Sequence, residues 1–166
     1  KNLKYTYDGS KWIAAEQYEV QNEQTVYAYH PYDQNATDMK LDIDLTKQED
    51  VMYGKCAVTP DFPTAKPVMN HALSLIRIKL MRDEYIGKGL ITDVMIKNVS
   101  SSLIMNIIDG DVLIQKDKSD ISIGGGFMLN DANPTVSEAI LPPLYHPDGV
   151  SLSFKLDGKE MSYTFP

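Results

Sequence analysis

The sequence predicts an all-β protein with an antiparallel sandwich architecture, and three observations lead to this prediction. Apolar and polar residues alternate along most of the chain, as they do in strands that bury one face. Turn-forming pairs of the Asp-Gly type separate the alternating runs. No window longer than two helical turns has apolar residues at helical spacing. Short strands with frequent turns and no interleaved helices favour a sandwich over a parallel α/β sheet.

The alternating runs can be placed in order along the chain. They cover residues 3–7, 26–32, 41–46, 90–97, 150–156 and 161–165. In the third run, Leu41 and Ile43 alternate with acidic residues, which predicts a half-buried strand with an acidic outer face. The last two runs are joined by Asp157-Gly158. Because a type I′ turn needs positive φ at both central positions, this pair predicts a hairpin of Val150–Leu156 with Lys159–Phe165.

The apolar segment from Val68 to Met81 changes phase along its length. Leu73 and Leu75 share one phase, whereas Ile76, Ile78 and Leu80 share the other. A regular strand cannot direct both sets into one core. Either both faces are buried or a β-bulge near Leu75-Ile76 shifts the phase, and we favour the bulge because Arg77 and Lys79 then face solvent.

Composition limits the classes of function. The chain has 166 residues, of which 43% are hydrophobic and 23% charged, as in an ordinary folded domain. The net charge of −7 argues against nucleic acid or an anionic membrane surface as the partner. The longest stretch without charged residues, 98–108, is too short to span a bilayer. The sequence starts at Lys1 without methionine, so we expect a processed or trimmed piece of a longer protein.

The segment 116–137 has the weakest apolar pattern and is rich in Gly, Asn and Asp. We therefore expect a long loop there, which separates a main sandwich over residues 1–115 from the strands of residues 138–166.

No set of residues indicates a metal site. His30, His71 and His146 are far apart in sequence and lack the spacing of zinc ligands. Asp42 and Asp44 share a strand face that could collect calcium, but their spacing does not match an EF-hand loop. The simpler interpretation of these carboxylates is a solvated acidic face.

Two groups of ring side chains have a structural and a functional interpretation. His71 is in phase with Leu73 and Leu75, so we expect a buried histidine with a structural role, hydrogen-bonded and without metal. Trp12, Tyr27 and Tyr29 could form a platform on which a sugar stacks. The alternative is that these tyrosines pair across strands and cover a sheet edge, which we favour.

Catalytic motifs are missing from the sequence. No serine lies in a Gly-x-Ser-x-Gly elbow, and no Lys-Ser or Lys-Thr pair follows Gly124-Gly125-Gly126. We expect neither enzymatic activity nor a cofactor.

Several ordered motifs resemble one family. They are Trp12, Val26-Tyr27-Ala28-Tyr29-His30-Pro31-Tyr32, Asp50-Val51-Met52-Tyr53-Gly54, His71-Ala72-Leu73-Ser74, Ile140-Leu141-Pro142 and Asp157-Gly158-Lys159. Their combination resembles the fimbrillin-like proteins, which are pilus subunits and related surface lipoproteins of Bacteroides-group bacteria. Two positions depart from the family pattern: His30 replaces the usual tyrosine and Asn70 a common lysine. Members typically continue beyond the position of Pro166.

The resemblance implies transthyretin-like β-sandwiches, of which this chain would contain the first and the opening strands of a second. It also implies export as a lipoprotein to the outer membrane and cell surface, without catalysis or cofactor. Its partners would be other fimbrial subunits, joined by β-strand addition, and host or bacterial surface glycans or proteins.

Two functions are therefore expected from the sequence. The first is a fimbrial subunit or tip adhesin that assembles by strand addition. The alternative is a carbohydrate-binding surface lipoprotein that uses Trp12, Tyr27 or Tyr29.

Overall fold

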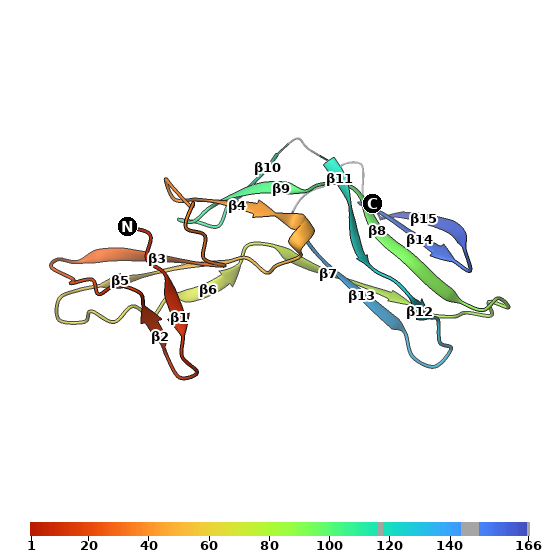
Figure 1. The fold of residues 1–166 in the computed structure, drawn as a ribbon, viewed down its shortest axis with the longest axis horizontal. Coiled ribbons are helices and arrows are strands. Elements are labelled where there is room, and N and C mark those ends of the chain that lie inside the picture. Colours follow the sequence, from red (N-terminus) through yellow and green to blue (C-terminus); the bar gives the residue numbers. More distant parts are fainter. Residues whose placement is uncertain (116–117, 144–149, 166) are drawn as a thin grey trace. The chain divides into compact units, whose positions relative to one another are not determined.

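The computed structural model describes residues 1–115, 118–143 and 150–165, and it consists almost wholly of β-strands (Figure 1). The strand pairs for which the register is defined are all antiparallel, so the predicted fold class is confirmed. No helix in these residues is long and apolar enough to cross a membrane. In chain order the elements are β1 (Tyr5–Tyr7), β2 (Trp12–Ala14), β3 (Gln24–His30), β4 (Lys40–Asp44), the 3-10 helix η1 (Leu45–Lys47), β5 (Met52–Val58), β6 (Val68–His71), β7 (Ser74–Leu80), β8 (Leu90–Ser100), β9 (Ser102–Asn106), β10 (Val112–Ile114), β11 (Lys118–Gly124), β12 (Phe127–Met128), β13 (Thr135–Leu141), β14 (Val150–Leu156) and β15 (Lys159–Phe165).

The chain forms two compact units that are interleaved in sequence. Unit 1 contains Lys1–Ile43, Asp50–Ala72 and Ile104–Leu113. Unit 2 contains Asp44–Glu49, Leu73–Leu103 and Ile114–Pro166. The sequence predicted a domain over residues 1–115 and the strands of a second domain over residues 138–166. These boundaries differ from those of the two compact units, and the division into domains stays a prediction.

Unit 1 is built around the sheet β3-β5-β6 and the pairing of β9 with β4. The β1-β2 hairpin forms a separate two-stranded sheet that projects from these strands (Figure 1). Leu41 and Ile43 of β4 are buried while Asp42 and Asp44 are exposed, which confirms the predicted half-buried strand. The other core side chains of this unit are Val51, Val58, Ala72, Met105 and Ile107.

Unit 2 packs the sheet β11-β8-β14-β15, which β12 extends, with the two-stranded sheet β7-β13. Its core comes from both sheets: Ile78, Ile91, Val94, Ile96, Val99, Ile121, Ala139, Leu141 and Leu152 are buried. The Ser137 hydroxyl on β13 donates to the Ile123 carbonyl on β11 at 3.0 Å, which joins the two sheets.

Gln48 of unit 2 completes the edge of β13 with its side chain. Its Oε1 accepts from the Ile140 amide at 2.8 Å, and its Nε2 donates to the Ile140 carbonyl at 3.1 Å and to the Leu45 carbonyl at 2.8 Å. A primary amide carries a donor and an acceptor, as a peptide group does. Gln48 therefore pairs with β13 as one residue of an added strand would.

The strand β8 contains a bulge that the alternation in sequence did not reveal. Asp93 has φ 53, and the register with β14 shifts between Ser153 and Lys155. As a result Ile91 and Val94 are both buried, whereas strict alternation back from Val94 would place Leu90, which is exposed, on the buried face. A bulge inserts an extra residue and changes the phase of the side chains beyond it.

The phase change in the segment 68–81 has a different cause from the expected bulge, and the prediction of a bulge near Leu75-Ile76 is wrong. The strand is interrupted at Ala72 and Leu73, both buried, so that β6 pairs in the sheet of β5 and β7 pairs with β13. Each strand then has its own inward face. Leu75 is exposed and Ile78 is buried, while Arg77 faces solvent as expected.

The expected loop over residues 116–137 is corrected in part. The strand β11 pairs with β8 within this range and buries Ile121, and β12 follows it. The composition of this segment predicted a loop because β11 has only one fully buried side chain among its seven residues, so the strand is mostly polar.

The predicted hairpin of the last two strands is confirmed. β14 and β15 pair along their whole length across Asp157 (φ 50) and Gly158 (φ 82).

Gly54 of β5 lies opposite Met69 of β6, where the two strands leave no room for a side chain. It is buried, and a Cβ at this position would overlap the Val68 carbonyl oxygen and lie 3.0 Å from the Met69 sulfur. Because the obstacle includes backbone, a side chain cannot be accommodated by a change of rotamer. The glycine is therefore needed for the β5-β6 pairing.

We expect Gly54→Ala to lower the free energy of unfolding by about 1–3 kcal/mol, the usual cost of overpacking. Urea denaturation measures the loss. Lys55→Ala, at the exposed neighbouring position, is the control and should change stability by less than about 0.5 kcal/mol. A Gly54→Ala protein as stable as the wild type would contradict the close approach of the two strands.

Candidate functional site

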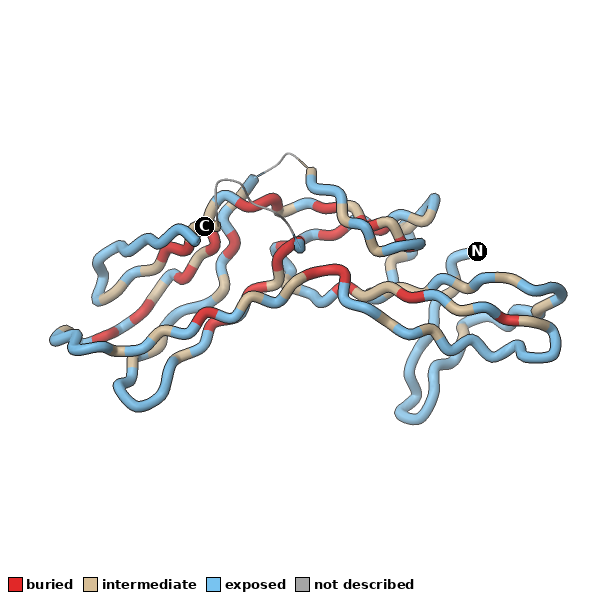
Figure 2. Tube along the Cα trace, turned by 180° about the vertical axis from the view of Figure 1, so that it is seen from behind, coloured by how far each residue is buried: buried red, intermediate tan, exposed pale blue. Residues whose placement is uncertain are grey.

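The strand β15 lies at the edge of the β11-β8-β14-β15 sheet and is the first candidate for a functional surface. All seven of its residues are exposed, and it appears in pale blue along its length in Figure 2. It stands last in the order β11-β8-β14-β15, so within the described part of the chain only β14 pairs with it. A strand with one neighbour presents unpaired N–H and C=O groups along its other edge.

One face of β15 is apolar although it is uncovered. Tyr163 lies opposite Leu152 and Met161 opposite Phe154 in the hairpin register. Side chains of directly opposed residues point to the same side of a sheet. Leu152 is only 2% exposed, but its neighbour Tyr163 is 59% exposed. The apolar face of β14 thus continues onto β15, where the other described residues leave it exposed.

Two aromatic side chains of β15 contact each other on this exposed face. The rings of Tyr163 and Phe165 meet edge to face, with centroids 4.8 Å apart. The opposite face of the strand is polar, and there the hydroxyls of Ser151 and Thr164 are 2.8 Å apart. The sequence predicted this alternation. It could not show that the described residues leave this face exposed, because a pattern does not reveal the neighbouring sheet.

Asp157 holds the turn of this hairpin against the start of β8. Its carboxylate accepts from the amides of Leu90 at 2.9 Å and Gly89 at 3.1 Å, and from the Tyr85 hydroxyl at 3.0 Å. These backbone hydrogen bonds stabilise the charged form and lower the pKa of Asp157 below its usual value. The sequence identified Asp157 only as a turn residue, since its partners lie far away in the chain.

The predicted aromatic platform is divided between two sheets. Trp12 lies on β2, is 62% exposed and contacts the ring of Tyr7 on β1, with centroids 5.4 Å apart. Tyr27 and Tyr29 lie on β3 instead, which pairs with β5. The Tyr29 hydroxyl lies 2.9 Å from both Asn2 Oδ1 and the Asp33 carbonyl oxygen, which gives it a structural role. A shared stacking function for the three residues stays a prediction.

His71 is exposed, and the prediction of its burial is wrong. Its side chain is 63% exposed, and Nδ1 lies 2.9 and 2.8 Å from the two carboxylate oxygens of Asp50. The cause is the strand break described above, because the buried residues at this point are Ala72 and Leu73. His71 ends β6, an edge strand, and its hydrogen bond is on the surface.

The carboxylates singled out in the sequence do not converge on a metal site. Asp44 accepts from the amide and the hydroxyl of Thr46 at 3.1 and 2.6 Å, and so caps η1. The Thr46 hydroxyl lowers the pKa of Asp44. No group of three or more metal-ligating side chains occurs in residues 1–115, 118–143 and 150–165. His30 ends β3 and is exposed, whereas His146 is outside the described residues.

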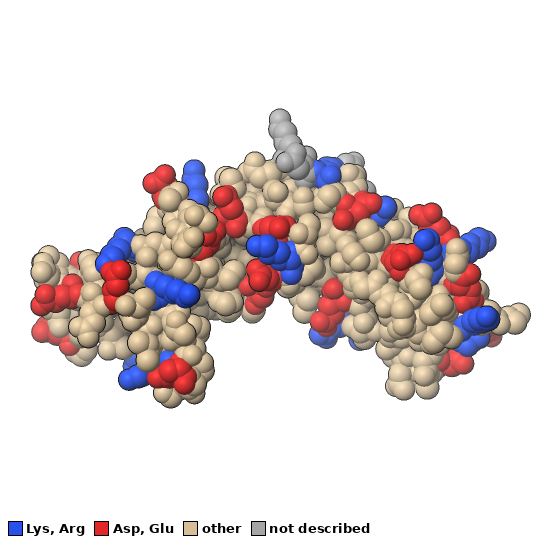
Figure 3. All heavy atoms as spheres, in the orientation of Figure 1, with Lys and Arg blue, Asp and Glu red and all other residues tan. Residues whose placement is uncertain are grey.

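Charges are mixed over the surface. Figure 3 shows acidic and basic side chains interspersed on the face that it displays. Several charged side chains of the described residues form ion pairs, such as Arg77 with Glu138 at 2.6 Å and Lys155 with Asp93 at 2.8 Å. On this face, basic side chains do not gather into the single patch that nucleic-acid binding uses.

The fimbrillin-like family matches the sequence over residues 1–166. The chain belongs to this family. The search among curated proteins gave no match. The ordered motifs that carried the resemblance thus identified the family correctly.

Two solved structures from Bacteroides share the fold. A provisionally assigned cell adhesion protein from Bacteroides uniformis ATCC 8492 is 19% identical, with a TM-score of 0.72 over 96% of this chain and 65% of its own. A second, from Bacteroides ovatus ATCC 8483, is 15% identical, with a TM-score of 0.73 over 99% of this chain and 67% of its own. The fimbrillin-like chain described here therefore spans about two thirds of these relatives.

We expect the stability of the β14-β15 hairpin to depend on the charge of Asp157. Because its pKa is lowered on folding, Asp157 stabilises the fold above its unfolded-state pKa of about 4, and this stabilisation is lost as pH falls through the lower folded-state value. Asp157→Asn tolerates the turn conformation but removes the charge. Its melting temperature should fall below that of the wild type at neutral pH, and the difference should shrink in acid.

Melting curves from about pH 7 to about pH 2 measure this dependence. Asp42→Asn, on the exposed side of β4, removes the same charge away from the hairpin and is the matched control. Parallel curves for Asp157→Asn and the wild type would show that the carboxylate does not hold the hairpin.

For His71→Ala we expect a small effect, because exposed ion pairs contribute about 0–1 kcal/mol. Urea denaturation at neutral pH should show a loss within that range. A loss above about 2 kcal/mol, typical of an unsatisfied buried partner, would contradict the exposed position.

Proposed function

We propose that this fimbrillin-like protein is a non-catalytic structural or adhesion subunit at the bacterial cell surface, and that it joins a neighbouring subunit by β-strand addition at β15. The observation that carries the proposal is the coincidence of a free strand edge and an uncovered apolar face on this one strand. Family membership and the cell adhesion relatives support the surface location.

Backbone geometry makes the free edge of β15 able to pair. Lys159 and Leu156 flank a two-residue turn and form a hydrogen-bonded pair, so alternate residues of β15 pair with β14. The intervening residues, among them Ser162 and Thr164, direct their N–H and C=O groups away from β14. An extended segment from a partner can accept and donate there.

The exposed apolar side chains of β15 favour association with a partner that buries them. Met161, Tyr163 and Phe165 are each at least 37% exposed on the continuation of a core face. Burial of apolar surface stabilises association by about 25 cal/mol per Å² before the losses of binding are counted. A partner strand beside β15 would extend the sheet and bring side chains over this face. Main-chain hydrogen bonds and apolar contacts would then act together.

We expect the purified chain to associate as its concentration rises and Ser162→Pro to weaken this association. Proline at this position removes one N–H from the free edge while the ladder with β14 is retained. Ser162→Thr keeps the N–H and is the matched control. Sedimentation velocity from micromolar to millimolar protein measures association, and backbone hydrogen exchange locates the protected strand.

Protection should appear at β15 in the wild type and in Ser162→Thr. A chain that stays monomeric to millimolar concentration, or association that Ser162→Pro leaves unchanged in a folded protein, would exclude strand addition at β15.

A further inference from the structure

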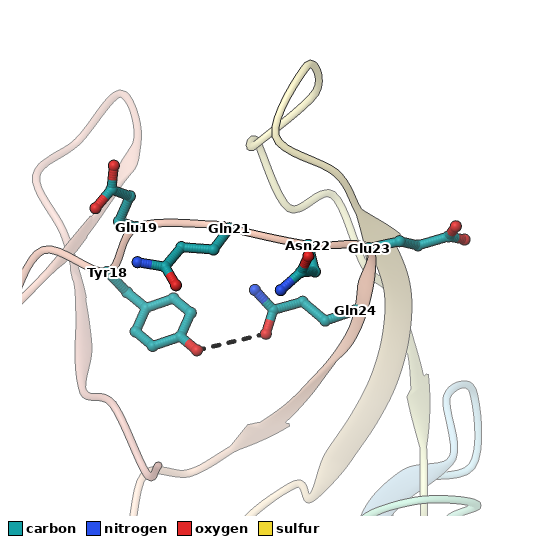
Figure 4. Close-up of a pocket in the computed structure, with 6 residues that line it drawn as sticks. All are labelled: Tyr18, Glu19, Gln21, Asn22, Glu23 and Gln24. Atoms are coloured by element: carbon teal, nitrogen blue, oxygen red, sulfur yellow. Dashed lines mark hydrogen bonds between the residues drawn. The ribbon is translucent and has the colours of Figure 1, made fainter.

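The loop before β3 forms a hollow on the surface of unit 1 (Figure 4). Its volume is about 540 Å³, within the range of small-molecule sites. The residues that line it are Tyr18, Glu19, Gln21, Asn22, Glu23 and Gln24. None of them contributed to the function proposed from the sequence, and the hollow is distinct from β15.

The side chains around the hollow are arranged by type. Figure 4 shows that Tyr18, Gln21 and Gln24 extend toward a common space, whereas Glu19 and Glu23 point away from it. The Tyr18 side chain is exposed, and its hydroxyl lies 3.4 Å from Gln24 Oε1. Gln21 and Asn22 are exposed, so a ligand in the hollow can reach their side-chain amides.

We propose that this hollow binds a neutral sugar. The electron-rich face of an exposed tyrosine attracts the weakly positive C–H groups of a pyranose ring. The amides of Gln21, Asn22 and Gln24 each donate and accept, so they match sugar hydroxyls, which also do both. An aromatic ring with three amides around one hollow thus provides both stacking and hydrogen bonds.

The charges around the hollow select against acidic sugars. The lining contains Glu19 and Glu23 but neither lysine nor arginine. An anionic group, such as the carboxylate of a sialic acid or a sulfate, would find no counter-charge and would be repelled by both glutamates and by the net charge of −7. Neutral hexoses and their N-acetyl derivatives carry no such group.

This inference gives a ligand class to the adhesive role proposed above, and in that sense it rests on that role. It is independent of strand addition, because the hollow and β15 belong to different units. It also differs from the platform of Trp12, Tyr27 and Tyr29, which uses other residues.

NMR titration of the ¹⁵N-labelled chain tests the proposal. The probes are the methyl glycosides of glucose, galactose, mannose, fucose and N-acetylglucosamine, with those of glucuronic acid and sialic acid as anionic counterparts. Each is added to about 20 mM, so that binding as weak as about −4 kcal/mol is detected. At least one neutral sugar should shift the amides of residues 18–24. Absence of shifts with all neutral probes, shifts confined to other residues, or stronger binding of the anionic probes would overturn the proposal.

Variants separate this hollow from the other aromatic surfaces. Tyr18→Ala should weaken the binding of the neutral sugar by about two- to tenfold, the value of one aromatic contact. Tyr5→Ala, at an exposed aromatic residue outside both candidate sugar surfaces, is the matched control and should leave it unchanged. The double variant Glu19→Gln, Glu23→Gln removes both negative charges, so it should reduce the ratio of the affinity for neutral sugars to the affinity for anionic sugars. Loss of binding in Trp12→Ala but not in Tyr18→Ala would assign the sugar to the β1-β2 hairpin and overturn the proposal.

Association of the chain in sedimentation separates the two hypotheses. If sugars fail to bind while Ser162→Pro still weakens association, sugar binding at the hollow is excluded and strand addition at β15 is retained. If sugars bind at residues 18–24 in a strictly monomeric chain, only strand addition is excluded.

Discussion

The need to pair backbone groups at strand edges is the constraint on which this structure depends. In an all-β chain the partner of each peptide group lies on another strand, and a strand at the end of a sheet has no second neighbour. Two strand edges in unit 2 differ in whether their backbone groups are paired. At Ile140 of β13 the side-chain amide of Gln48 supplies both a donor and an acceptor. At β15 no strand of the described residues supplies them.

The exposed strand β15 keeps its conformation because its other contacts are strong. It pairs with β14 in seven register positions, and Asp157 anchors the turn to the amides that precede and begin β8. β8 in turn lies between β11 and β14 and contributes Ile91, Val94 and Ile96 to the core. The edge is thus held in an extended conformation by paired strands, which reduces the ordering that a partner strand has to supply on binding.

Local features of the fold could be predicted from the sequence, and features set by distant strands could not. The β14-β15 turn follows from Asp157-Gly158, whose φ angles only certain residues adopt readily. The exposure of His71 depends on a crossing from one sheet to another at Ala72 and Leu73, which periodicity cannot show.

The same distinction between local and distant features holds for the candidate surfaces. Tyr163 was expected on a strand with an inward face, and it is, but its exposure among the described residues depends on elements far away in the chain. Trp12 was grouped with Tyr27 by residue type, whereas the register of the β1-β2 hairpin places it beside Tyr7. The hollow at Tyr18 arises from the path of a loop, for which the sequence has no periodic signal.

The interleaving of the two units also affects how this protein can diversify. The chain passes from one unit to the other between residues 43 and 44, 49 and 50, 72 and 73, 103 and 104, and 113 and 114. Neither unit corresponds to a continuous stretch of gene, so a single recombination event within residues 44–113 would produce hybrids of both units at once. A crossover between residues 48 and 113 would also separate the parental pair of Gln48 and Ile140. We therefore expect variation at the surface of this protein to accumulate by point substitution and loop exchange rather than by the transfer of whole units.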